Sequence, residues 1–352
     1  MEIRVMLMGF GNVGKGFCRL VYEKKDFLRQ NTGITVSITG IATRTHGCIY
    51  DAEGIDLGVL MSGIEEDPGK QLWQVAGYEN PFQYSPRDMV EKGDYDVMAE
   101  CTVTSLDSYE QALFYMENAL SRGKSVITSN KAPIAFCYNR LSDLAQKNRG
   151  KVFFEGTVMS GTPLFSTFLG GMSGSRVNSF EGVLNGTCNY ILEKMQGEMS
   201  FDKALEEARL KGYAEADPSM DIKGYDTALK ALIISNVMME GICSDLDEID
   251  ITGIDDIPPE MFEGAKRSSG KLRLLARGIF DGERKILSVR PEVLDEGHPL
   301  YNLPGAMNGI VLDTDTLGRI CMTGAGAGSR ETGSAMLHDL VSFSRSFAKV
   351  GI

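Results

Sequence analysis

A glycine pattern near the start of the chain restricts its fold more than any other feature. A short apolar run at 3–8 is followed at once by G-x-G-x-x-G, formed by Gly9, Phe10, Gly11, Asn12, Val13 and Gly14. Between a strand and a helix, this spacing is typical of the loop that holds the pyrophosphate of a dinucleotide. The first glycine permits a tight turn, the second admits the phosphates to the backbone, and the third lets helix and strand pack closely. A glycine turn without a ligand is the alternative.

Strand-like and helix-like segments alternate after this loop. We expect helices at 11–28 and 108–122 and strands at 34–43, 95–100 and 125–128. Such alternation predicts a parallel sheet with helices on both faces. The polar residues between 51 and 94 include many glycines and prolines, so we expect irregular structure there.

The pattern changes after Pro133, where helical and strand-like runs mix. The predicted fold class is α/β, with a Rossmann-type dinucleotide-binding domain followed by an α+β domain on a mixed sheet. We place the first domain at 1–133, the second at 134–318, and a C-terminal segment that returns to the first domain at 319–352.

Composition limits the possible partners. The net charge of −12 disfavours nucleic acid and anionic membranes, and no apolar run approaches the 18 residues of a membrane span. The seven cysteines are scattered without a C-x-x-C pair, and the three histidines have no metal-ligand spacing. Reduced thiols in a cytoplasmic protein are the expected state. A catalytic role for Cys101, Cys137 or Cys188 is disfavoured because none of these three has a histidine near it in sequence.

The end of the second predicted strand bears on the choice of nucleotide. An Asp or Glu is usual there when the ligand is NAD, because the carboxylate binds the ribose hydroxyls. This chain has Ala42-Thr43-Arg44-Thr45 instead. Arg44 could pair with a 2′-phosphate, which favours NADP; a solvated loop arginine is the alternative.

Polar residues also follow the next two strands. Thr102 and Val103 come after 95–100, where contacts to the ribose or nicotinamide are expected, although a helix N-cap would look similar. Lys131 follows 125–128 and could hold a carboxylate or a carbonyl oxygen; a surface lysine is the alternative.

The segment 211–230 concentrates charge just before an apolar run that must be buried. Its acids are Glu215, Asp217, Asp221 and Asp226, with Glu207 just upstream. Asp226 and Lys230 are four residues apart and share one face of a helix. The simplest interpretation is a surface ion pair, but the apolar neighbours of the pair favour a buried functional cluster.

With these residues in view, the chain resembles homoserine dehydrogenases. The matching segments keep the family's order: GFGNVG at 9–14, TSNKAP at 128–133, EGTVMSGTP at 155–163, VLNGTCNYIL at 183–192, GYAEADPSMDIKGYDTALK at 212–230, and GAGAG with ETGSA at 324–335. The resemblance implies reversible hydride transfer between NAD(P)H and L-aspartate 4-semialdehyde, giving L-homoserine for threonine, methionine and isoleucine biosynthesis. It also implies a homodimer formed through the second domain.

The resemblance assigns roles by motif position. Lys230 matches the family's acid/base lysine and Lys131 its second essential lysine. Glu215, Asp221 and Asp226 match substrate-site acids, and Asp226 is expected to assist catalysis. The glycine-rich turn at Gly326 and Gly328 is expected near the cofactor.

The resemblance also suggests a monovalent cation such as sodium, held mostly by backbone carbonyls. The matching positions are Glu155, Val158, Ser160 and Thr162. The family often has EATVGAGIP where this chain has EGTVMSGTP, and the changed residues include Gly156, Met159 and Thr162. Because the chain ends at Ile352, we expect the short form without an ACT regulatory domain and without feedback inhibition through one.

The expected substrate needs an acid for its ammonium, a cation for its carboxylate and a proton donor for its oxygen. The acids and lysines above supply these types, and nearby carboxylates should make oxidation require a higher pH. Two alternatives remain. The altered 156–162 segment would suit a related NADP-dependent reductase of another amino-acid or hydroxy-acid semialdehyde. A non-enzymatic cofactor-binding regulator is also possible, although it would not need both lysines with their acids.

Overall fold

The computed structural model describes residues 1–78, 84–106, 108–239, 241–243, 245–280, 282 and 285–347. The chain divides into two compact units. The first contains residues 1–157 together with the C-terminal part from Gly328, and the second runs from Val158 to Ala327. The three-part division at 133 and 318 stays a prediction.

The first unit is built on a six-stranded sheet in the order β3-β2-β1-β4-β5-β6. Its strands are β1 (Glu2–Met8), β2 (Thr35–Ala42), β3 (Cys48–Tyr50), β4 (Val97–Glu100), β5 (Ser125–Thr128) and β6 (Val152–Phe153). All neighbouring pairs are parallel except β2 and β3, which form an antiparallel pair. This is the strand order of a doubly wound nucleotide-binding sheet, in which ligands bind outside the carboxyl ends of the strands.

Helices cover both faces of this sheet. They are α1 (Asn12–Glu23), α2 (Lys25–Thr32), α3 (Leu57–Glu66), α4 (Leu72–Val75), α5 (Pro86–Lys92), α6 (Glu110–Ser121), α7 (Lys131–Lys147) and α14 (Ser329–Phe347). Alternate side chains of β1 point to opposite faces. Val5 and Leu7 belong to the core formed with Phe17 of α1 and Leu340 of α14, whereas Met6 lies with Met89 of α5 against Gly40.

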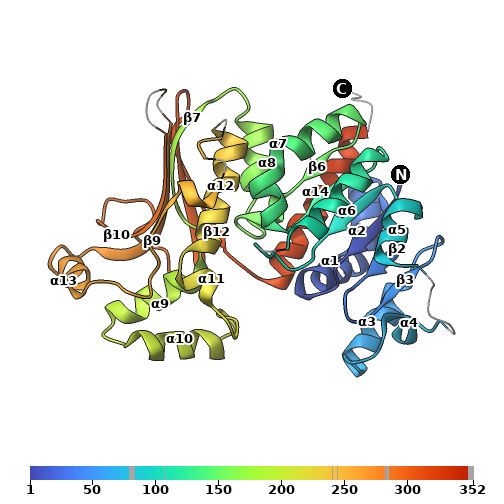
Figure 1. Ribbon diagram of the computed structural model, residues 1–352, viewed down its shortest axis with the longest axis horizontal. Coiled ribbons are helices and arrows are strands. Elements are labelled where there is room, and N and C mark those ends of the chain that lie inside the picture. The colour runs from blue at the N-terminus through green and yellow to red at the C-terminus, as the bar shows by residue number, and fades with distance from the viewer. Residues whose placement is uncertain are drawn as a thin grey trace. The chain divides into compact units, whose positions relative to one another are not determined.

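The C-terminal helix belongs to this first unit. Figure 1 shows α14 (red) beside α1 (blue). A Cβ at Gly16 would lie 2.1 Å from the Ser329 carbonyl oxygen, and one at Gly333 would lie 2.7 Å from the Gly16 carbonyl carbon. The two helices therefore approach so closely that only glycine fits at these crossing points.

The second unit has a mixed six-stranded sheet in the order β12-β11-β7-β9-β10-β8. Its strands are β7 (Val177–Val183), β8 (Asp250–Ile251), β9 (Lys271–Phe280), β10 (Lys285–Leu294), β11 (Met307–Thr314) and β12 (Gly318–Ala325). Only the β10–β8 pair is parallel. The helices are α8 (Leu164–Gly171), α9 (Gly186–Gln196), α10 (Phe201–Leu210), α11 (Ser219–Ile222), α12 (Tyr225–Met238) and α13 (Pro259–Arg267). The predicted α/β fold class with a mixed second sheet is confirmed.

Helix α12 carries the lysine and aspartate singled out in the sequence. It contacts β9 and β10, and most of its residues are buried on every side. A helix that is apolar all round must lie inside the protein. The predicted surface-like spacing of Asp226 and Lys230 therefore occurs within a buried helix.

Three details of the predicted elements are wrong. The helix expected at 11–28 is interrupted at Lys24, which has φ −104° and ψ 10° and separates α1 from α2. A change of pattern is expected after Pro133, but Pro133 is the third residue of helix α7. Proline is tolerated there because the N–H groups of a helix's first turn have no intrahelical partner. The described part of 51–94 contains α3, α4 and α5 despite its glycines; residues 79–83 lie outside the described part.

Candidate active site

The glycine loop has the shape that a dinucleotide requires. Gly9 has φ +94°, and a Cβ there would lie 2.6 Å from the Cys101 carbonyl oxygen. A Cβ at Gly14 would lie 2.7 Å from the Gly9 carbonyl oxygen, so these two glycines are needed for packing. At Gly11 no atom lies within 4 Å of the Cβ position, and the residue is exposed. The open space above Gly11 and the start of α1 at Asn12 fit a phosphate group approaching the helix N-terminus.

Other predicted nucleotide contacts lie around this loop. Phe10 is buried, whereas Asn12 is exposed and Val13 is partly buried. Arg44 is exposed in the bend after β2, and its guanidinium makes no hydrogen bond or ion pair with another described residue. Val103, directly after β4, is 89% exposed, which is unusual for an apolar side chain. An exposed arginine and an exposed valine at the carboxyl edge are available to a ligand.

A fully buried carboxylate supports the same edge of the sheet. Glu100 ends β4 and accepts hydrogen bonds from the amide and hydroxyl of Thr102 and, at 3.2 Å, from the Thr128 hydroxyl. The Asn130 amide group donates to the Thr102 hydroxyl at 3.2 Å. Burial raises the pKa of Glu100 to about 7, although these hydrogen bonds oppose the rise. The network fixes Thr102, so Glu100 supports the predicted cofactor contact; the sequence analysis missed this role.

We expect the Glu100 carboxyl to make stability depend on pH. Its pKa is about 7 in the folded chain against 4.5 as an ordinary glutamate, so the folded state holds the proton more tightly. The stabilisation is complete below the unfolded value and is lost as the pH rises through 7, in total about 3 kcal/mol. Glu100→Gln should therefore show a smaller fall in the thermal unfolding midpoint between about pH 5 and pH 8 than the wild type.

The matched control for this prediction is Glu110→Gln, which changes an exposed carboxylate in the first turn of α6. It should keep the wild-type pH dependence. If Glu100→Gln and the wild type lose stability equally over this range, the Glu100 carboxyl does not take up the proton.

Lys131 begins α7 and is partly buried. Its backbone N–H donates to the Thr104 hydroxyl at 3.3 Å, which ties α7 to the loop after β4. Lys131 and Thr102 thus belong to neighbouring strand ends in the first unit, as predicted from the parallel sheet.

In the second unit, Lys230 is buried and held by two acceptors. Its ammonium Nζ lies 2.8 Å from Asp226 Oδ2 and donates to the Leu184 carbonyl oxygen at 2.7 Å. The side chains of Lys230 and Asp226 are only 9% and 14% exposed. An ion pair this well shielded from water is not the weak surface pair of the simpler interpretation.

Two asparagines complete this cluster, and sequence reasoning missed both. Asn185 donates to Asp221 Oδ1 at 2.7 Å and to Asp226 Oδ2 at 3.0 Å. Asn308 on β11 donates to the Leu184 carbonyl at 2.7 Å. Asn185 could have been noticed as the N-cap of α9 in LNGT, but nothing in the sequence pairs Asn308 with residue 184.

The remaining predicted substrate and cofactor residues have different surroundings. Glu215 is exposed on the loop before α11, and Asp221, on α11, is partly buried beside Asn185. A Cβ at Gly326 would lie 2.2 Å from Asn308 Oδ1, and Gly328 has φ +139°. Glycine is therefore required at 326 and 328 for packing and backbone conformation, whatever else contacts them.

The predicted cation positions lie on the segment between β6 and α8. Glu155, Val158 and Ser160 are buried and Thr162 is partly buried. The Glu155 amide donates to Asp339 Oδ2 at 3.0 Å, and Ser160 adopts φ +51°. Among the described residues, no group of three or more His, Cys, Asp and Glu side chains could hold a metal.

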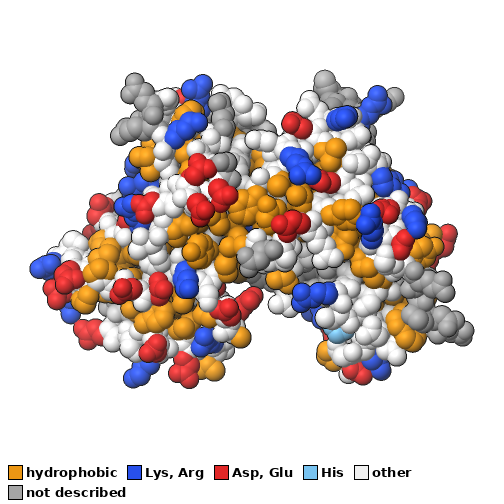
Figure 2. All heavy atoms as spheres, in the orientation of Figure 1, with side chains coloured by type: hydrophobic (Ala, Val, Ile, Leu, Met, Phe, Trp, Pro, Cys, Tyr) orange, Lys and Arg blue, Asp and Glu red, His pale blue; other side chains and the backbone are white. Residues whose placement is uncertain are grey.

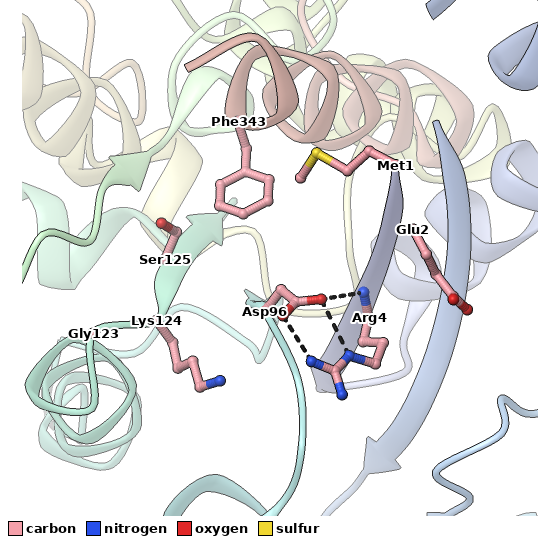
Figure 3. A pocket seen from close by; sticks show the side chains of 8 residues that line it. All are labelled: Met1, Glu2, Arg4, Asp96, Gly123, Lys124, Ser125 and Phe343. Atoms are coloured by element: carbon pink, nitrogen blue, oxygen red, sulfur yellow. Dashed lines mark hydrogen bonds and ion pairs between the residues drawn. The ribbon is translucent and has the colours of Figure 1, made fainter. Parts of the chain in front are cut away.

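Two buried cysteines and one cavity lie apart from these clusters or lack the chemistry of a reactive centre. Burial raises the pKa of the Cys101 and Cys188 thiols, which disfavours a thiolate nucleophile. A cavity of about 530 Å³ lies at the amino-terminal edge of the first sheet, where Arg4 pairs with Asp96 and Lys124 lines the wall (Figure 3). No predicted site residue lines this cavity.

The surface carries charges of both signs. On the face drawn in Figure 2, acidic side chains lie among the basic ones rather than apart from them. Within the described ranges, no helix combines the length and the apolar character needed to cross a bilayer.

Comparison with known proteins gives consistent matches to both units. A family profile for homoserine dehydrogenase matches residues 163–341, and one for the homoserine dehydrogenase NAD-binding domain matches residues 9–155. The homoserine dehydrogenase of Methanocaldococcus jannaschii is 34% identical over 96% of this chain and 97% of its own length. An NAD(+)-dependent homoserine dehydrogenase of Pseudomonas canavaninivorans is 31% identical over 97% of this chain and 96% of its own length.

Solved structures give the same result. A putative homoserine dehydrogenase of Archaeoglobus fulgidus superposes with a TM-score of 0.84 at 32% identity, covering 97% of this chain and 99% of the other. A hyperthermophilic archaeal homoserine dehydrogenase in complex with NADPH superposes with a TM-score of 0.83 at 30% identity, covering 99% and 100%.

Proposed function

The chain belongs to the homoserine dehydrogenase family, and from this premise we propose that Lys230 is the acid/base residue of its reaction. The family match confirms the predicted NAD(P)-dependent oxidoreductase acting between L-aspartate 4-semialdehyde and L-homoserine. The match gives no separate support to the two alternatives, which were a reductase of another semialdehyde and a regulator without activity. The observation that carries the role of Lys230 is its burial with Asp226 and the Leu184 carbonyl.

A nicotinamide nucleotide held by the glycine loop would supply hydride to the aldehyde carbon in reduction and accept it from the alcohol carbon in oxidation. Lys230 gives a proton to the substrate oxygen as the alcohol forms and takes it back in the reverse direction. Asp226 supports catalysis by holding the Lys230 ammonium at 2.8 Å. Because that carboxylate stabilises the ammonium form, homoserine oxidation should require a higher pH than semialdehyde reduction.

The substrate's own charges suggest the partners of its other groups. We assign Glu215 and Asp221 to the substrate ammonium, and Lys131 to the substrate as the second lysine. The exposure of Glu215 supports this role, since an exposed carboxylate can meet a ligand without first breaking a contact. Substituting Glu215 by glutamine should raise the KM for homoserine more than the KM for the nucleotide. A KM for homoserine equal to that of the wild type would refute this assignment.

For the cofactor we propose NADP, bound by the glycine loop, Thr102, Val103 and Lys131, with the turn at Gly326 and Gly328 close to it. The preference rests on Arg44, which is exposed beyond β2 and has no described partner. An archaeal relative was solved in complex with NADPH, whereas the Pseudomonas relative is NAD(+)-dependent, so each nucleotide is associated with one of these relatives.

Arg44→Ala should lower the preference for NADPH. A lost charge-assisted hydrogen bond to the 2′-phosphate corresponds to about 1.5–3 kcal/mol, or roughly 10- to 150-fold in the ratio of kcat/KM for NADPH to that for NADH. The value for NADH itself should hardly change. Steady-state assays with the two cofactors measure this ratio, and a ratio equal to that of the wild type would mean that Arg44 does not read the phosphate.

A monovalent cation such as sodium is proposed at the backbone of Glu155, Val158, Ser160 and Thr162. Support comes from the burial of Glu155, Val158 and Ser160 and from the left-handed conformation of Ser160. Comparing activity in sodium, potassium and bulky organic-cation buffers tests this site, and identical activity in all three would argue against it.

We also propose a homodimer in the cytoplasm, with substrate binding and dimerisation in residues 134–318. Sedimentation of the purified protein tests the assembly, and a monomer at micromolar concentration would contradict it.

The activity itself is tested by mixing the protein with L-aspartate 4-semialdehyde and each reduced cofactor while following the absorbance of the reduced nicotinamide. Absence of oxidation with both cofactors would refute the assigned reaction.

A further inference from the structure

Both acceptors of the Lys230 ammonium are shared with a second donor. The Leu184 carbonyl oxygen, 2.7 Å from Lys230 Nζ, also accepts from the Asn308 amide at 2.7 Å. Asp226 Oδ2, 2.8 Å from Nζ, also accepts from the Asn185 amide at 3.0 Å. Neither acceptor can turn away from the lysine without breaking a second hydrogen bond, one buried and one partly buried, which would cost free energy.

The orientation of the Asn185 amide is set by the fold. Its Oδ1 accepts the Cys188 backbone N–H at 2.8 Å as the N-cap of α9. The opposite end of the amide must then face the acids, and its two N–H groups donate to Asp221 and Asp226. One neutral side chain thus links the start of α9 with α11 and α12.

Asn308 is equally constrained. It is fully buried on β11, and the backbone of Gly326 lies directly against its amide, where a Cβ would come within 2.2 Å of Oδ1. This explains within the second unit why glycine is needed at 326: a larger residue would displace the amide that holds the Leu184 carbonyl.

Charge balance gives Asn185 a second effect. Lys230 pairs with Asp226 of α12. The charged groups that act on the nearby Cys188 thiol of α9 are Asp221 of α11, Asp226, Lys230 and Asp255 after β8, three acids and one ammonium. The Asn185 amide donates N–H groups to two of these carboxylates, which disperses the negative charge beside the ammonium.

We propose that Asn185 and Asn308 are positioning residues that hold the two acceptors of the Lys230 ammonium and limit the negative charge it experiences. The proposal rests on the function proposed for Lys230. It predicts that changing Asn185 alters the pH dependence of the reaction and not merely its speed.

The decisive variant is Asn185→Asp, which keeps the capping oxygen for Cys188 but replaces the two N–H donors with an additional carboxylate. The pH profile of homoserine oxidation should move to higher pH by about one unit or more, because the added charge stabilises the lysine ammonium. The KM for NADPH should stay within about twofold, since no change is made at the glycine loop. Asn302→Asp, the same chemical change at an exposed asparagine, should leave the profile unchanged.

A second variant keeps the test sharp if the added charge prevents folding. Asn185→Ser retains an N-cap oxygen without a new charge and should move the profile in the same direction by a smaller amount. An unchanged profile in either variant, with a wild-type thermal midpoint, would overturn the proposal. If Lys230→Ala is inactive while the pH profiles of the Asn185 variants are unchanged, the positioning role of Asn185 is refuted but the acid/base role of Lys230 stands. If Lys230→Ala is active, the acid/base role of Lys230 is refuted.

Discussion

Lys230→Ala should lower turnover in both directions by about 10²- to 10⁴-fold, the usual contribution of a positioned acid or base. The affinity for NADPH should stay close to that of the wild type, because the glycine loop, Arg44 and Thr102 belong to the other unit. Stopped-flow turnover and fluorescence titration of NADPH measure the two quantities separately.

The fold of this variant needs its own check, because the substitution leaves Asp226 buried without its ammonium. Breaking a buried pair on one side can cost about 3–5 kcal/mol, although Asn185 still donates to the carboxylate. Lys223→Ala, an exposed lysine on the same segment, is the matched control and should retain full activity. A Lys230→Ala enzyme that turns over at the wild-type rate would exclude the acid/base role.

The second large effect is expected on NADPH binding and on stability when two glycines of the loop, Gly11 and Gly9, are changed to alanine. Gly11→Ala should fold normally, since no atom lies within 4 Å of the new methyl group. It should nevertheless weaken NADPH binding by about 5- to 150-fold, the equivalent of 1–3 kcal/mol of overpacking against the phosphates. Thermal unfolding without ligand and NADPH titration together test this separation.

Gly9→Ala should instead damage the first unit itself. The new Cβ would lie 2.6 Å from the Cys101 carbonyl oxygen at a backbone φ of +94°, where L side chains are strained. Its thermal midpoint should fall even without nucleotide. Gly170→Ala, which meets no atom within 4 Å in a helix of the second unit, controls for the substitution. Unaltered NADPH affinity in Gly11→Ala would mean that the backbone there does not approach the phosphates.

Local patterns predicted the glycine loop of the nucleotide-binding domain. The G-x-G-x-x-G loop specifies its own turn, because Gly9 and Gly14 leave room that side chains would fill. The positions of Thr102 and Lys131 could also be predicted, because each follows a parallel strand and neighbouring parallel strands end at the same edge of the sheet. The break at Lys24 and the start of α7 were missed because they depend on packing and on a proline tolerated in a first turn.

The cluster around Lys230 could be predicted only in part. The i, i+4 spacing brings Asp226 and Lys230 onto one face of a helix wherever that helix lies. Their burial, and with it the difference between a weak surface pair and a tightly held ammonium, depends on α12 packing against β9 and β10. Spacing along a chain cannot report on the environment of a side chain.

By itself the sequence determined the fold class, the family and the identities of the lysines and acids, because periodicity, glycine spacing and local motifs act over a few residues. Only the tertiary structure decided which groups surround the lysine. Asn308 and Leu184 are 124 residues apart, yet a single hydrogen bond joins them beside Lys230. Such contacts arise when strands and helices distant in sequence share one core, and no local pattern encodes which partners will meet there.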